Sequence, residues 1–311
     1  MRINHLVMAH EDAPAFGRLV TILANREGAR VFAHIDAKID GRPFVEATDA
    51  DVAHVRRRAV HWGGFSQVLA MMDLLRTAVE VDPADRYVFL SGRDYPARPL
   101  AEFEALLEAH PDREYMTFYA MVPGSEFFFI RRHYWSGDLF GRLPQSLKPT
   151  VEQLMGRINA RLPARALPAG LPLYRGSTSW AVTHRTALTI LQFAESRKGR
   201  ALAAFCRSAR VPDEIFFQTI VLNSDRAALI DTHRIVDGVQ VGGRERWDDS
   251  GLHYIDWDPG RENPAVLHLG DLDAVRRSGK YFVRKVGSEI SGPLVEALDS
   301  AAYEHDRART A

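Results

Sequence analysis

Three short polar stretches of the sequence carry residue types that could bind a ligand or transfer a proton. The first, Ser91-Gly92-Arg93-Asp94, follows Tyr87-Val88-Phe89-Leu90, an apolar run typical of a strand buried on both faces. Ligands of open α/β sheets bind beyond the carboxyl ends of the strands. The charged pair at residues 93 and 94 is therefore a site candidate, and a plain polar turn is the alternative.

The other two stretches lie where helices are predicted to begin. Trp62-Gly63-Gly64 precedes one of them, and paired glycines let the backbone approach an anion at a helix N-terminus. A tight turn would explain the same glycines. Pro212-Asp213-Glu214 opens another predicted helix, with carboxylates that could exchange protons. Acids in a first helical turn also favour the helix dipole and need no further role.

The elements that must position these residues follow an alternating order. A strand over residues 3–10, a helix that Asp12 can cap and a strand over 31–36 form a βαβ unit, which predicts a parallel sheet. Ser66 is predicted to cap the helix that leads into the strand over 87–90. The basic run at 56–58 indicates a solvated surface. The pattern weakens over 135–172, where we expect an insertion over one face.

Composition limits the possible classes of protein. The chain has 311 residues with 46% hydrophobic and 26% charged residues, as in soluble globular enzymes. Its formal net charge of +0 argues against a general nucleic-acid-binding surface. The single cysteine, Cys206, allows no intrachain disulfide and fits a reducing compartment. We find no signal peptide and no membrane-spanning stretch, so a cytoplasmic protein is expected.

Eight short motifs, in order over roughly residues 1–287, resemble the core-2/I-branching β-1,6-N-acetylglucosaminyltransferase and peptide O-xylosyltransferase family. Each motif is weak alone, and their order makes the resemblance specific. The motifs are HIDAK at 34–38, WGGFS at 62–66, LSGRDYP at 90–96, FIRR at 129–132, GSTSW at 176–180, PDEIFFQT at 212–219, YIDW at 254–257 and YFVRK at 281–285.

The resemblance implies an α/β GT-A fold with a Rossmann-like, mostly parallel sheet flanked by helices. It also implies a UDP-sugar donor, an inverting mechanism and no metal or other cofactor. We expect one domain over 1–311. Its nucleotide-binding half would span 1–110, its acceptor and catalytic half 111–287, and a peripheral C-terminal helix 288–311.

Transfer from a UDP-sugar must stabilise a leaving diphosphate. Many GT-A enzymes use a metal held by Asp-x-Asp after a central strand, but residues 91–94 carry one carboxylate here. Asp-x-Asp triplets at 49–51, 256–258 and 271–273 are interpreted as chance occurrences. A fixed cation pair is the remaining way to offset the charge. Arg284 and Lys285 match the diphosphate-binding Arg-Lys of the family, although neighbours on a regular strand point to opposite faces.

The resemblance also assigns the other site residues. Glu214 matches the catalytic glutamate, the general base that an inverting transfer needs, and Asp94 matches a donor-binding aspartate. Asp36 and Trp62, Gly63 and Gly64 are expected to line the nucleotide pocket. Trp180 and Trp257 could stack on sugar rings or belong to the core. The xylosyltransferases of the family carry an acid where this chain has Ser179, which disfavours a two-carboxylate mechanism and a xylosyltransferase-like acceptor.

The expected function is metal-independent, inverting transfer of GlcNAc or xylose from a UDP-sugar to a hydroxyl of a glycan or lipid-linked oligosaccharide, forming a β-linkage. Peripheral membrane association stays open, and no nucleic-acid partner is expected. The alternative is a non-catalytic nucleotide-sugar or glycan-binding protein of the same fold. A sugar nucleotidyltransferase would need a glycine-rich phosphate loop near the N-terminus, and residues 10–17 contain none.

Overall fold

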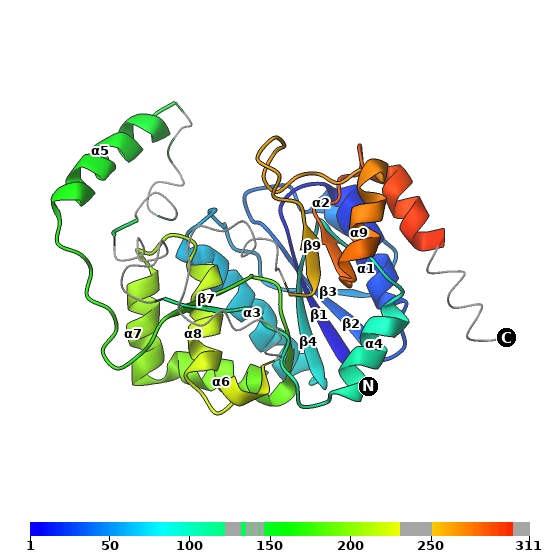
Figure 1. The fold of residues 1–311 in the computed structure, drawn as a ribbon, viewed down its shortest axis with the longest axis horizontal. Helices are drawn as coiled ribbons and strands as arrows, with labels where there is room; N and C mark the ends of the chain where they lie inside the picture. The colour runs from blue at the N-terminus through cyan, green and yellow to red at the C-terminus, as the bar shows by residue number, and fades with distance from the viewer. Residues whose placement is uncertain (122–131, 135–137, 139–142, 144–145, 231–250, 301–311) are drawn as a thin grey trace.

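The protein has a mixed α/β fold built around a mostly parallel central sheet, as predicted (Figure 1). Its strand order is β3-β2-β1-β4-β8. Four strands run parallel, β1 (Ile3–Ala9), β2 (Ala29–Ile35), β3 (Val52–His54) and β4 (Arg86–Ser91), and β8 (Ala181–Thr183) is antiparallel to β4. This computed structural model describes residues 1–121, 132–134, 138, 143, 146–230 and 251–300.

Successive strand residues point into two hydrophobic cores, one on each face of the sheet. Leu6 and Phe89 belong to one core, and their chain neighbours Val7 and Leu90 belong to the other. A parallel sheet covered on both faces requires such continuous apolar strands. Each fully buried side chain of this kind contributes roughly 1.5–3 kcal/mol to folding.

Helices cover both faces of the sheet (Figure 1). The first core receives the apolar sides of α3, α6, α7 and α8, and the second receives those of α1 and α4. The bounds of these helices are Phe65–Val81 (α3), His184–Glu195 (α6), Arg197–Cys206 (α7), Phe216–Leu222 (α8), Ala13–Ala24 (α1) and Leu100–Ala109 (α4).

The start of α3 differs from its prediction. Its N-cap is Gly64, and Ser66 lies in the first turn, where its Oγ accepts a hydrogen bond from the backbone N–H of His61. The backbone N–H of Ser66 donates to Asp138 Oδ2 over 2.9 Å. A carboxylate from a distant segment therefore satisfies a helix-end donor that sequence analysis assigned to a local cap.

The helix predicted from Pro212 is also divided in the structure. Pro212–Glu214 forms one 3-10 turn, η2, and α8 begins only at Phe216. Val211, which precedes the turn, has a φ of 48°, and its N–H donates to the carbonyl of Gly63. The two acids thus lie in a separate turn just before α8 and not in its first turn, as the sequence predicted.

A second, three-stranded sheet carries the cationic motif. β10 (Phe282–Arg284) lies between β5 (Asp94–Pro96) and β9 (His253–Ile255). Asp94 and Arg284 are register partners in the antiparallel β5–β10 pair. The helix over 292–300 buries Leu294, Val295 and Leu298 in a third core beside this sheet. The described part of this helix lies at the edge of the molecule (Figure 1) and packs one apolar side against the sheet.

The predicted insertion contains α5 (Lys148–Arg161), which stands apart from the sheet in Figure 1. Residues 129–131 of the FIRR motif lie outside the described part of the chain. Among the described helices, none is both long and apolar enough to cross a bilayer. The remaining short elements are α2 (Arg42–Glu46), β6 (Tyr119–Ala120), β7 (Tyr174–Arg175), η3 (Ala227–Leu229), η5 (Leu269–Asp271) and α9 (Leu272–Ser278).

Candidate active site

A cavity of about 410 Å³ lies at the carboxyl edge of the central sheet. Residues at the ends of β1, β2 and β4, the loop over 175–179, η2 and β10 line it. This is where an open α/β sheet is expected to bind its ligand. The predicted site residues that line this cavity are Asp36, Trp62, Gly63, Ser179, Glu214, Trp257 and Arg284. Gly64, Asp94, Trp180 and Lys285 are not in the described wall.

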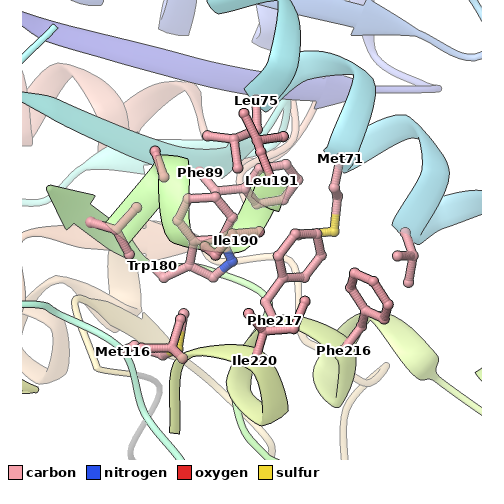
Figure 2. Close-up of a cluster of buried hydrophobic side chains, with 14 of the residues drawn as sticks. Met71, Leu75, Phe89, Met116, Trp180, Ile190, Leu191, Phe216, Phe217 and Ile220 are labelled. Atoms are coloured by element: carbon pink, nitrogen blue, oxygen red, sulfur yellow. The ribbon is translucent and has the colours of Figure 1, made fainter. Parts of the chain in front are cut away.

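Trp180 belongs to the core. Its side chain is fully buried, with ring centroids 5.5 Å from Phe89 and 5.6 Å from Phe217 (Figure 2). It cannot stack on a sugar, so that prediction is wrong. Trp62 is instead 69% exposed at the cavity wall, with the Arg210 guanidinium 5.6 Å from its ring centre.

The two glycines of the Trp-Gly-Gly motif have separate roles. Gly63 lines the cavity and has a φ of 69°, a conformation that other residues rarely adopt. A Cβ on Gly64 would lie 2.5 Å from the Asp138 carboxylate. Gly64 is therefore required for the approach of Asp138 to the start of α3, and its predicted place in the nucleotide pocket is corrected.

Asp36 is held firmly at the end of β2. Its Oδ1 accepts hydrogen bonds from the N–H groups of Lys38 (2.9 Å) and Val60 (3.3 Å). Arg57 donates to the carbonyls of Ile35 and Asp36 over 3.1 and 2.7 Å. One member of the basic run at 56–58, interpreted from sequence as solvated surface, thus fastens the strand end that presents Asp36.

Asp94 lies behind the cavity and holds Arg284 in its wall. Asp94 Oδ1 lies 3.1 Å from Arg284 Nη1, and Oδ2 lies 3.0 Å from His253 Nε2. The N–H and Oγ of Ser91 each donate to the same carboxylate over 2.9 Å. Asp94 therefore positions a cation of the cavity wall, and its role in donor binding stays a prediction. His253, which directly precedes the YIDW motif, was not among the predicted site residues.

The protonation of Asp94 should be visible in the acid stability of the protein. Burial alone would raise the pKa of this carboxyl, but the charge and hydrogen bond of His253 and the charge of Arg284 lower it from 3.8 to about 2. The depressed pKa stabilises the fold above pH 3.8, and that contribution is lost as the pH falls toward 2. Its size is about 2 kcal/mol, since one pKa unit corresponds to about 1.4 kcal/mol.

We therefore expect Asp94→Asn to melt well below the wild type at neutral pH, with the difference shrinking between about pH 4 and pH 2. Melting temperatures of both proteins across this range measure the effect. A constant difference would show that ionisation of Asp94 does not support the fold.

Lys285 follows the end of β10 and pairs with a different acid from Arg284. Its Nζ lies 3.2 Å from the Glu262 carboxylate, and its side chain is 14% exposed. Glu262 is 72% exposed, so this ion pair contributes little by itself. The Lys285 ammonium has three N–H donors, so a diphosphate could bind it beside Glu262 or in place of it.

Glu214 forms an ion pair that the sequence did not indicate. Arg175 Nε donates to Glu214 Oε2 over 2.6 Å, and its Nη2 also contacts Oε2. Arg175 is 8% exposed and Glu214 26% exposed by side chain, and both line the cavity. The backbone N–H of Gly176 donates to the Glu214 carbonyl, which ties this pair together. A Cβ at Gly176 would lie 1.9 Å from the Thr117 carbonyl, so only glycine fits there.

Asp213 and Glu214 are adjacent acids with raised proton affinity. Burial, and then the charge of Glu214, raises the pKa of Asp213. Burial also raises the pKa of Glu214, and the charge of Arg175 offsets part of that change. Carboxyl groups with perturbed pKa values in a cavity are candidates for acid–base chemistry.

The Asp-x-Asp triplet at 256–258 has a structural partner. Arg261 Nη1 donates to Asp256 over 2.6 Å and to Asp271 over 2.9 Å, which joins two of the three triplets. Among the described residues, no three His, Cys, Asp or Glu side chains are grouped closely enough to hold a metal ion.

Comparison with known proteins gives a family match over most of the chain. The profile of the Core-2/I-Branching enzyme family matches residues 3–276. Xylosyltransferase 2 of Homo sapiens is 24% identical over 97% of the chain, and that of Rattus norvegicus is 26% identical over 97%. Xylosyltransferase 1 of Rattus norvegicus is 24% identical over 79%. The chain spans about a third of the length of these relatives, 34%, 34% and 28% respectively.

Proposed function

Because the chain belongs to the core-2/I-branching enzyme family, whose members are glycosyltransferases, we propose that it transfers GlcNAc or xylose from a UDP-sugar to a hydroxyl of a glycan or lipid-linked oligosaccharide. The proposed transfer inverts the anomeric carbon, forms a β-linkage and uses no metal. The observation that carries the proposal is a carboxylate paired with an arginine, Glu214 with Arg175, in the same cavity wall as a second arginine, Arg284.

Glu214 is proposed as the general base. Both Arg175 contacts are to Oε2, so Oε1 is the oxygen offered to the acceptor hydroxyl. As Oε1 takes the proton, the hydroxyl oxygen bonds to the anomeric carbon. The bond from that carbon to the diphosphate breaks, and its electron pair leaves with UDP. Burial supports the role, because a raised pKa makes the carboxylate a stronger base.

Arg284 is proposed to bind the diphosphate, with Lys285 as a second cation. A guanidinium held in place by Asp94 and Ser91 is a preorganised donor for the charge that develops on the leaving group. Asp36, Trp62 and Gly63 would contact the nucleoside. Trp257 remains a candidate for stacking on the acceptor, since it lines the cavity.

The experiment that tests this function begins with thermal-shift screening of UDP, UDP-GlcNAc, UDP-xylose, UDP-glucose and UDP-glucuronate. We expect UDP and at least one UDP-sugar to raise the melting temperature, and the stabilising donor to be consumed when an acceptor glycan is added. Stabilisation without transfer to any acceptor would favour a non-catalytic binding protein. No shift with any uridine nucleotide would contradict the proposed function.

Metal independence leads to a separate expected result. Both oxygens of Asp94, the one carboxylate after the central strand, already contact Ser91 together with Arg284 or His253. Metal coordination there would have to replace these contacts. We expect the Kd for UDP, measured by calorimetry, to be unchanged by EDTA. Loss of binding that manganese restores would overturn this part of the proposal.

A further inference from the structure

Asp213 presents an unpaired carboxylate oxygen beside the general base. The residue is 4% exposed and lines the cavity. Its Oδ2 accepts a hydrogen bond from Gln67 Nε2 over 2.9 Å. Its Oδ1 is buried and has no partner within the described part of the chain. Leaving a buried acceptor unpaired is costly, so a ligand group that donates to Oδ1 would bind favourably.

Two elements that are distant in the sequence hold this carboxylate. Asp213 lies in η2, and Gln67 lies in the first turn of α3 and also lines the cavity. The backbone bond from Val211 to Gly63 fastens η2 to the segment that leads into α3. The direction of Oδ1 is thus fixed from both sides, as in a preorganised binding group.

Two of the charges that act on Asp213 belong to residues with proposed functions in the cavity. Arg175, which holds the general base, and Arg284, which is proposed to bind the diphosphate, both act electrostatically on Asp213. The transferred sugar is bonded to the diphosphate on one side and attacked by the acceptor hydroxyl on the other. It must therefore occupy the space between these groups.

We infer that Asp213, oriented by Gln67, binds a hydroxyl group of the transferred sugar and contributes to the choice of donor. The inference rests on the proposed function. The sugar hydroxyl donates to Oδ1, while Oδ2 keeps its bond to Gln67. A donor with no hydroxyl at that place leaves Oδ1 unpaired, and sites built to pair a hydroxyl discriminate strongly against ligands that lack it.

Binding measurements can test this role apart from catalysis, with UDP as the reference ligand. Calorimetry or competition gives Kd values for UDP, UDP-GlcNAc, UDP-xylose and UDP-glucose with the wild type, Asp213→Ala and Asp213→Asn. For the sugar that the wild type binds best relative to UDP, we expect Asp213→Ala to lose about 10-fold or more in affinity, with UDP within about 2-fold. Differences among the three sugars should shrink as well. Asp213→Asn keeps the size of the side chain and an acceptor for Gln67. It should lower the UDP-sugar affinity relative to the UDP affinity, as Asp213→Ala does.

The outcomes distinguish failure of this inference from failure of the proposed function on which it rests. Suppose that the wild type binds and transfers the sugar, and that both variants keep its ratio of UDP-sugar affinity to UDP affinity. This result would overturn the role of Asp213 and leave the proposed function standing. Equal losses for UDP and the UDP-sugars would indicate that Asp213 only supports the fold, and this result also overturns the role. Failure of the wild type to bind any of the four ligands would overturn both. If Asp213→Ala does not fold, the ratio for Asp213→Asn decides.

Discussion

Replacing Glu214 with glutamine is expected to lower the rate of sugar transfer by about 100-fold or more, because an amide cannot take the proton of the acceptor hydroxyl. The glutamine side chain can still accept a hydrogen bond from Arg175, so the local structure should survive. The measurement is single-turnover transfer from the best UDP-sugar, together with the Kd for UDP and the melting temperature. UDP affinity should stay close to that of the wild type.

The control for this variant must be an acid outside the cavity. Asp213 cannot serve, since the structure places it in the cavity wall beside Glu214. Glu102 is better matched: it lies in the first turn of α4 and forms an ion pair with Arg98. We expect Glu102→Gln to keep nearly full transfer. Similar rates for the two variants would remove Glu214 from the role of base.

Replacing Arg284 with alanine is expected to weaken UDP binding by roughly 1.5–3 kcal/mol, the range for hydrogen bonds to charged groups, which corresponds to about 10- to 150-fold. Uridine should be affected much less, because it lacks the diphosphate. Calorimetry with UDP and with uridine measures both effects. Lys285→Ala should act in the same direction, because Lys285 is the second cation proposed to bind the diphosphate.

Arg185→Ala provides the matched control, because Arg185 forms an exposed ion pair with Asp225 and is not part of the described cavity wall. It should leave both ligands unaffected. Equal losses of UDP and uridine in Arg284→Ala would indicate a folding role for Arg284. In that case the anchoring by Asp94 and His253 would serve the three-stranded sheet alone.

Local patterns in the sequence were sufficient to predict the frame of the molecule. The apolar runs at 3–10, 31–36 and 87–90 predict buried parallel strands, and β1, β2 and β4 confirm them. A buried strand followed by a polar turn also predicts the edge of the sheet at which a ligand binds. Ser91, in such a turn, lies in the cavity wall. Patterns of this kind work because strand burial and helix amphipathicity are set by neighbours a few residues apart.

The direction of each side chain was decided by tertiary packing. Trp180 and Ser179 are adjacent, yet one is in the core and the other in the cavity wall. The start of α3 shifted from its predicted place because Asp138, 72 residues away from Ser66, supplies the acceptor for a helix-end N–H. The residues near Ser66 in the sequence do not indicate that Asp138 will be its partner.

The chemistry of the candidate site depends on contacts between distant segments. Arg175 meets Glu214 across 39 residues, Gln67 meets Asp213 across 146, and His253 meets Asp94 across 159. The sequence determined which carboxylates and cations are present and the strand ends and turns where they stand. Only the tertiary structure decided which of them pair, which oxygen stays unpaired and how strongly each holds its proton, because hydrogen bonding and desolvation depend on what the fold brings together.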